Sequence, residues 1–194
     1  MDVHLPHLYL IKQIQQFRKG DRPAYAIVTG PTSGIGRAFA FSLAKKGFNL
    51  ILVSRSLQKL KELESEITWR YQNIDIVLCD VDMGAYPLDA QFESTVREVA
   101  ETKGDIRILV NNAGRSHDMP ATFEDTSVEE MEGIIGVNVG GVVRATKIVL
   151  PFMVNEKFHS SKTLLMIEKR KNGLLTWEVL LLIRLPRYID IPSR

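Results

Sequence analysis

The residue pattern with the clearest chemical meaning is a glycine-rich turn, TGPTSGIG, at residues 29–36. Glycine is needed where a chain turns tightly, where backbone approaches a pyrophosphate and where a helix packs close to a strand, and Gly30, Gly34 and Gly36 suit these tasks. The free N–H groups at the start of the following helix then face an anion. The turn therefore predicts a dinucleotide site, with a plain glycine-rich turn as the alternative.

A cationic side chain follows the second predicted strand. A protein selective for NAD(H) places Asp or Glu there to hold the ribose 2′-hydroxyl. This chain has Arg55, which offers a planar cation to a 2′-phosphate, and Arg37 after the glycine turn is a candidate second contact. The cofactor expected is therefore NADP(H), and the alternative is that Arg55 is a solvated surface residue.

Further polar residues follow the later predicted strands. Asp80 comes after the third strand, where it could accept a hydrogen bond from an adenine amino group or cap a turn. The fourth strand runs directly into Asn-Asn-Ala-Gly at residues 111–114. All these residues lie just after predicted strands, at the ends where ligands bind in sheets of this kind.

Strands and helices alternate along the chain and must position those residues. Short apolar runs predict strands at 24–29, 49–53, 74–79 and 106–110, and helical periodicity predicts helices at 35–46, 57–70 and about 89–102. Ser56 is expected to cap the second helix, and Gly47 to end the first. The alternation implies right-handed crossovers, so the fold class is α/β, a Rossmann-type doubly wound parallel sheet.

Composition narrows the class of partner. The chain has 194 residues, 45% of them hydrophobic and 25% charged, and a formal net charge of +2. This length suits one domain, and no basic block is long enough to indicate nucleic-acid binding, so we expect a small-molecule partner. A single cysteine, Cys79, excludes an internal disulfide. The four histidines lack metal-ligand spacing, so no metal site is expected.

No membrane segment is expected from the sequence. The N-terminal residues lack the apolar core of a secretory leader. The richest apolar run, at residues 173–185, is interrupted by Glu178 and Arg184 and is shorter than the roughly 20 residues that cross a bilayer.

Three motifs in this order resemble the short-chain dehydrogenase/reductase family: the glycine turn, Asn-Asn-Ala-Gly, and Asn138 within Val-Asn-Val-Gly-Gly. The segments FRKGD, KKGFNLILVSRS and Arg115-Ser116-His117 are most similar to fungal very-long-chain 3-oxoacyl-CoA reductases and their 17β-hydroxysteroid dehydrogenase relatives. The resemblance covers about residues 17–176.

The resemblance also implies roles for individual residues. Asp80 would hold the adenine, and Asn112, with Gly114 in the same motif, the nicotinamide-side ribose. Asn138 would hold a water of the proton relay through its backbone carbonyl. The pyrophosphate would be held by Gly30, Ser33, Gly34, Ile35 and Gly36.

The remaining catalytic residues of the family are not found. Its Tyr protonates the carbonyl oxygen, its Ser orients that oxygen and its Lys lowers the tyrosine pKa, since a phenol of pKa about 10 is a poor acid at neutral pH. Tyr188 is followed four residues later by Pro192, and no other tyrosine has a lysine at that spacing. Residues 160–162, Ser-Ser-Lys, come too early and are interpreted as a loop. The chain is expected to lack reductase activity.

The C-terminal part departs from the family. The resemblance to a fifth strand, GLILTMGSF, stops at Thr176, after which a shift of one nucleotide would restore Met-Gly-Ser-Phe. We therefore interpret the chain as truncated or frame-shifted after about Thr176, with a divergent C-terminus as the alternative. The expected organisation is an extension at 1–22, an incomplete NADP-binding domain at 23–176 and a divergent tail at 177–194. A fifth strand near 173–183 would leave the sheet incomplete at its C-terminal edge.

Two functional classes remain. The first is NADPH-dependent reduction of a 3-oxoacyl-CoA in fatty-acid elongation, or of a ketosteroid or related ketone, with this chain inactive. The second is a catalytically silent NADP-binding or interaction protein. The resemblance implies an endoplasmic reticulum location, with the cytoplasm otherwise, and a homo-oligomer that this chain is expected to form poorly.

Overall fold

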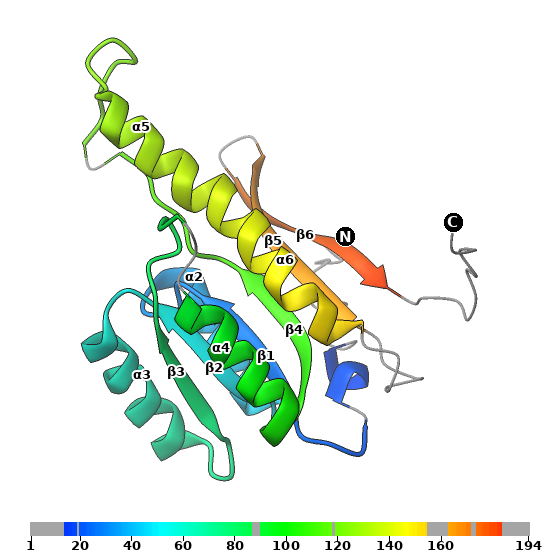
Figure 1. Ribbon diagram of the computed structural model, residues 1–194. Coiled ribbons are helices and arrows are strands. Elements are labelled where there is room, and N and C mark those ends of the chain that lie inside the picture. Colours follow the sequence, from blue (N-terminus) through cyan, green and yellow to red (C-terminus); the bar gives the residue numbers. More distant parts are fainter. Residues whose placement is uncertain are drawn as a thin grey trace, which may run out of the picture.

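A six-stranded sheet with helices on both faces forms the body of the protein (Figure 1). The computed structural model describes residues 14–18, 20–86, 90–117, 119–154, 163–171 and 174–183. The strand order is β3-β2-β1-β4-β5-β6. The strands are β1 (Ala24–Thr29), β2 (Asn49–Ser54), β3 (Ile76–Asp80), β4 (Asp105–Asn111), β5 (Thr163–Lys171) and β6 (Leu174–Ile183).

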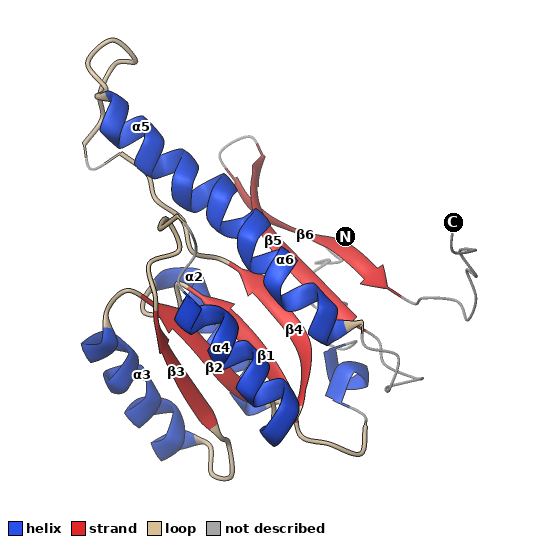
Figure 2. Ribbon diagram, viewed as in Figure 1, coloured by secondary structure: helices blue, strands red, loops and turns tan. Residues whose placement is uncertain are grey.

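Helices cover the two faces of the sheet in two pairs (Figure 2). Helices α2 (Gly34–Lys45) and α3 (Leu57–Arg70) cover one face, and α4 (Ala90–Glu98) and α6 (Val142–Met153) the other. The strand β1 supplies both cores, because Ala26 and Val28 face the first pair and Tyr25 and Ile27 the second. A strand buried on both faces is continuously apolar, as the sequence AYAIVT predicts.

Local signals end and begin the helices as predicted. Gly47 adopts φ +79° after α2, a conformation that favours glycine, and its N–H donates to the carbonyl of Ala44 at 2.8 Å. The Ser56 hydroxyl accepts from the Lys59 N–H at the start of α3. The first four strands lie where the sequence predicts them to within two residues at each end.

A strand forms at Leu174–Ile183 as predicted, but it is the sixth strand of the sheet and does not lie beside β4. The strand beside β4 is β5, parallel to it with Ile108 opposite Leu164, and this segment was not predicted as a strand. The segment predicted as the fifth strand is instead β6, which pairs antiparallel with β5 and lies at the end of the strand order. The described sheet therefore has six strands, five of them parallel.

A long helix follows β4 in the chain, and its last part packs against the sheet. Helix α5 (Val128–Ile135), the π-helical segment η3 (Gly136–Gly141) and α6 run continuously over Val128–Met153, 26 residues with a mean hydropathy of 1.4 in the most apolar window. By length and composition this helix meets the criteria for a membrane span, which the sequence did not lead us to expect of any segment. Core helices of soluble proteins meet the same criteria, and α6 buries Ala145, Val149 and Met153 against the sheet.

Two short segments complete the described part. The 3-10 helix η1 (Ile14–Arg18) buries Ile14 and Phe17 in the same core as α2 and α3. The π-helical segment η2 (Val99–Lys103) continues α4 and leads into β4.

Candidate functional site

Thr29 and Asn112 join the carboxyl ends of β1 and β4. The buried Thr29 hydroxyl donates to the Val110 carbonyl at 3.2 Å and accepts the N–H groups of Asn112 and Ala113, each at 3.0 Å. The Asn112 side-chain amide donates to the carbonyls of Thr29 and Gly30, at 3.0 and 2.9 Å. The two predicted motifs, far apart in the sequence, therefore form one rigid edge.

The glycine turn lies on this edge with its backbone open to one side. Gly30 and Gly34 adopt φ of +64° and +53°. A Cβ at Gly36 would collide with the Asn112 amide and the Gly30 carbonyl, whereas a Cβ at Gly34 would meet no atom within 4 Å. Ser33 is the N-cap of α2 but makes no side-chain capping bond. The first N–H groups of α2 thus face a cradle that glycine keeps open, where an anion is favoured.

The two arginines near the turn have different surroundings. Arg55 is exposed beyond β2, and no described residue forms a hydrogen bond or ion pair with it. Arg37 pairs with Glu66 on α3, and its guanidinium lies 4.8 Å from the ring centre of Phe41. In this structure the charge of Arg37 is paired with Glu66, and its role as a second phosphate contact stays a prediction.

Two carboxylates, those of Asp80 and Asp82, lie at and just after the end of β3. Asp80 is exposed at the carboxyl end of the strand, opposite Ser54 of β2. The turn that follows is capped by Asp82, whose carboxylate accepts from the Gly84 N–H at 2.8 Å. The turn-capping role considered for Asp80 falls on Asp82, so Asp80 stays available at the edge.

Asn138 holds the loop that follows Gly114. Its side-chain oxygen accepts from the Arg115 N–H at 2.7 Å, and its amide donates to the Arg115 carbonyl at 2.8 Å. Asn138 lies within the π-helical segment η3, a local widening of the helix that is frequent at functional sites. The side chain of Asn138 therefore fixes the backbone at the entry of the loop.

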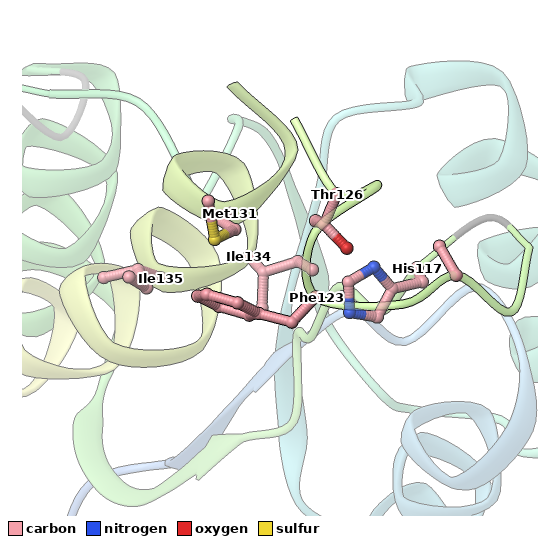
Figure 3. Close-up of a pocket in the computed structure, with 7 residues that line it drawn as sticks. His117, Phe123, Thr126, Met131, Ile134 and Ile135 are labelled. Carbon is pink, nitrogen blue, oxygen red and sulfur yellow. The ribbon is translucent and has the colours of Figure 1, made fainter. Parts of the chain in front are cut away.

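A mostly apolar pocket of about 390 Å³ opens between this loop and α5 (Figure 3). His117, Ala121, Phe123 and Thr126 come from the loop side, and Met131, Ile134 and Ile135 from the helix. The His117 Nδ1 lies 3.0 Å from a carboxylate oxygen of Glu130. Such a volume and lining suit the apolar part of a small ligand.

At the opposite edge, formed by the amino ends of the strands, polar side chains are bonded to one another. The Tyr25 hydroxyl donates to Asp75 at 2.5 Å, and Lys103 donates to the same carboxylate at 3.0 Å. Burial and the neighbouring Asp75 raise the pKa of Tyr25 far above its usual value. Partial burial would raise the pKa of Asp75, but hydrogen bonds from Tyr25 and Lys103 outweigh it and hold that pKa below 3.8. Tyr25 is therefore a poor acid, unlike a catalytic tyrosine.

A second cluster on that edge is more deeply buried. Asp105 receives Arg107 at 2.5 Å and Arg22 at 3.3 Å, and the side chains of Asp105 and Arg107 are 4% and 5% exposed. Among the described residues no group of three or more His, Cys, Asp and Glu could hold a metal ion. His4, His7 and His159 lie outside the described residues.

Comparison with known proteins decides the family. A model of the short chain dehydrogenase family matches residues 24–161, from the first residue of β1 to just before β5. The chain belongs to the short-chain dehydrogenase family. The glycine turn, Asn-Asn-Ala-Gly and Asn138, from which we inferred the resemblance, all lie in the matched part.

Two curated relatives of the chain share a name. Very-long-chain 3-oxoacyl-CoA reductases of Mycosarcoma maydis and Aspergillus oryzae are 45% and 40% identical to it over 144 and 146 residues. The matches cover 70% and 75% of this chain but 38% and 41% of the relatives. The chain thus spans about two fifths of the length of the curated relatives it matches.

Solved structures agree on the fold. An alcohol dehydrogenase from Thermococcus sibiricus complexed with 5-hydroxy-NADP matches with a TM-score of 0.59 and 29% identity over 69% of this chain and 54% of that one. L-sorbose reductase from Gluconobacter frateurii, complexed with NADPH and L-sorbose, gives 0.59 and 28% over 69% and 49%. The doubly wound α/β fold predicted from the sequence is confirmed.

The sequence did not indicate the part that three residues play at the carboxyl ends of the strands. The Thr29 hydroxyl joins the two motifs, the Arg115 backbone is the group that Asn138 holds, and Glu130 partners His117. A threonine directly before the first glycine of the turn was an available signal for the first. The other two depend on contacts between segments that no local pattern shows.

Proposed function

We propose that this chain binds NADP(H) across the carboxyl edge of β1, β2, β3 and β4. The observation that carries the proposal is the open cradle at Gly34, beside the N–H groups at the start of α2 that have no side-chain cap. Arg55, just after β2, has no partner among the described residues. Pyrophosphate suits such a helix start, and a 2′-phosphate suits an exposed guanidinium. Relatives of the same fold, complexed with NADPH, support the choice of cofactor.

In this proposal each predicted residue contacts a particular part of the cofactor. Asp80 accepts from the adenine, Arg55 pairs with the 2′-phosphate, and Asn112 and Gly114 lie against the nicotinamide-side ribose. Because the Asn112 side-chain amide already donates twice within the protein, its oxygen acceptors are the groups left for a ribose hydroxyl. The pyrophosphate contacts come from Gly30, Ser33, Gly34, Ile35 and Gly36.

The reaction class we propose for the protein is NADPH-dependent reduction of a 3-oxoacyl-CoA or a related ketone. When bound, NADPH supplies the hydride for such a reduction. The names of the curated relatives and the apolar pocket beside the Arg115 loop support an acyl substrate. The pocket would hold apolar carbon chain, with His117 at its polar end. An acyl-CoA elongation enzyme would be expected at the endoplasmic reticulum.

As given, the chain is proposed to bind the cofactor without reducing a ketone. None of its tyrosines is followed four residues later by lysine, and Tyr25 is held protonated by burial and Asp75. Asn138 alone of the proposed catalytic residues is present. A second candidate function is therefore a catalytically silent NADP-binding or interaction protein, which the exposed apolar side chains of the long helix favour.

Titration of the purified chain with NADPH and NADH, followed by cofactor fluorescence, tests the proposal. We expect saturable binding with NADPH preferred, and no oxidation of NADPH when a 3-oxoacyl-CoA is added. Absence of binding would refute the cofactor site. Oxidation of NADPH that depends on the acyl-CoA would refute the silent state and leave the reductase assignment.

A further inference from the structure

The segment after β3 packs directly against the π-helical segment η3. A Cβ at Gly141 would lie 2.5 Å from the Met83 carbonyl oxygen, and a Cβ at Gly84 would lie 2.9 Å from a methyl group of Val137. Glycine on both sides of the contact therefore lets two backbones approach closely. This contact joins the chain that continues from Asp80 to the helix that carries Asn138.

Arg144, about one helical turn after Gly141, forms hydrogen bonds to both sides of this contact. Its Nη2 donates to the Gly136 carbonyl at 3.2 Å and to the Met83 carbonyl at 3.3 Å. Helical side chains lean toward the N-terminus, which brings this guanidinium back over η3. Its planar donors bind one carbonyl on each partner, and the Tyr86 ring lies 5.5 Å away over the cation.

The contact continues to the loop beyond Gly114. Asn138 in η3 holds both the N–H and the carbonyl of Arg115. A continuous series of bonds therefore runs from residues 81–86, through Arg144, to η3, Asn138 and the Arg115 backbone. In the proposed cofactor site these two ends are the adenine end and the nicotinamide end.

We infer that Arg144 is a positioning residue that couples the two ends of the site. It keeps η3 seated on Met83, so that Asn138 is placed to hold the Arg115 loop. Restraint of the adenine-end segment by a nucleotide is then passed to a loop that the nucleotide's adenine half does not reach, and the coupling is reciprocal. The link between the segments is independent of the proposed function, and only the identity of the ligand rests on it.

Hydrogen exchange without any ligand tests the link itself. In Arg144→Met we expect the Arg115 amide to exchange about tenfold faster than in wild type, the scale of one lost hydrogen bond to a carbonyl. Arg144→Lys, which keeps one donor, should lie between the two. The matched control is Arg97→Met, since Arg97 on α4 also lies over an aromatic ring, Phe152, but pairs with the Glu93 carboxylate and is not part of this contact.

Core amides separate positioning from general destabilisation. If Val28 in β1 keeps its protection in Arg144→Met while Arg115 loses it, the inference holds. Equal changes at Val28 and Arg115 would mean that Arg144 only stabilises the fold, and an unchanged Arg115 amide would mean that it does not position the loop. Either result overturns the inference, and neither depends on cofactor binding.

Adenosine 2′,5′-bisphosphate, which carries the adenine half of NADPH alone, tests the coupling. We expect it to slow exchange at Arg115 and Ser116 in wild type and in Arg97→Met by about fivefold, the lower end of usual coupling, and not in Arg144→Met. Slowing that persists in Arg144→Met would overturn the coupling. If wild type binds neither this compound nor NADPH, the proposed function fails, while the ligand-free exchange still decides whether Arg144 positions the loop.

Discussion

The amino and carboxyl edges of the same sheet carry similar polar residues that are used in opposite ways. At the amino edge Asp75 and Asp105 are each bonded to two partners: Asp75 to Tyr25 and Lys103, and Asp105 to Arg22 and to Arg107 of its own strand. At the carboxyl edge Asp80 and Arg55 are exposed, without a hydrogen-bond or ion-pair partner in the part of the chain that the structure describes. Charge at a strand end therefore says little about function until its partners are known.

The difference follows from the fold. In parallel sheets the crevice that takes ligands lies outside the carboxyl ends of the strands. Polar groups at the amino ends have no ligand to meet, so burial there must be compensated within the protein. Stability should therefore respond most to changes at the amino edge, and cofactor affinity to changes at the carboxyl edge.

The largest effect should come from Asp105→Ala at the amino edge. Loss of this carboxylate removes a charged partner of the buried Arg107, and we expect the free energy of unfolding in urea to fall by about 3–5 kcal/mol. Glu93→Ala, which removes the exposed partner of Arg97, should change it by less than about 1 kcal/mol. NADPH affinity of the folded fraction should be unchanged in both, and a loss of affinity in Asp105→Ala would erase the contrast between the edges.

The next largest effect should come from Gly34→Ala at the carboxyl edge. The added methyl group occupies the open cradle, and we expect NADPH affinity to fall about a hundredfold, or about 2.7 kcal/mol. Gly47→Ala is the control, because Gly47 also has positive φ but lies at the other end of α2. Both should lose about 1 kcal/mol of stability. Equal cofactor affinities in the two variants would contradict the position of the site.

Substitution of Arg55 should have a smaller and more selective effect. We expect Arg55→Gln to weaken NADPH about tenfold, or about 1.4 kcal/mol, and to leave NADH unchanged. Arg37→Gln is the matched control, since Arg37 is already paired with Glu66. Fluorescence titrations with both cofactors measure the ratio. If Arg37→Gln lowers the preference for NADPH instead, Arg37 is the contact to the 2′-phosphate and Arg55 is not.

The smallest effects concern Tyr25 and Asp75. Tyr25→Phe should cost about 1 kcal/mol, as expected for one hydrogen bond. The lowered pKa of Asp75 means that its stabilisation is present above its unfolded pKa of about 3.8 and is lost as pH falls through the folded value. Stability measured from about pH 5 to about pH 2 should therefore fall less steeply in Asp75→Asn than in wild type. Equal slopes would show that Asp75 is not stabilised by its partners.

Much of the site edge was predictable because its signals are local. The first four strands are short runs of mostly apolar residues, and Gly47 and Ser56 act within one helical turn. The glycine turn is recognisable because each of its three glycines meets a requirement of the backbone at its position. These features depend on neighbouring residues alone, so one sequence is enough to place them.

The rest depends on contacts between distant segments. The pairing of Arg37 with Glu66, 29 residues later, could not be read from the local sequence around the glycine turn. The strand β5 contains the charged run EKRK, which hides it from a search for apolar strands. Asn138 was recognised from its motif, but its bonds to Arg115 and the widened helix around it follow from packing.

The antiparallel pairing of β5 with β6 has a consequence for the order of folding. These strands are adjacent in sequence, with Lys171 opposite Leu174, whereas β1 and β4 bring Ala24 beside Asp105. Closing a short loop costs less entropy than closing a long one, and hairpins form in about 1–10 μs. The hairpin can therefore form early as a local unit, and its docking on β4 must wait until the parallel core has assembled.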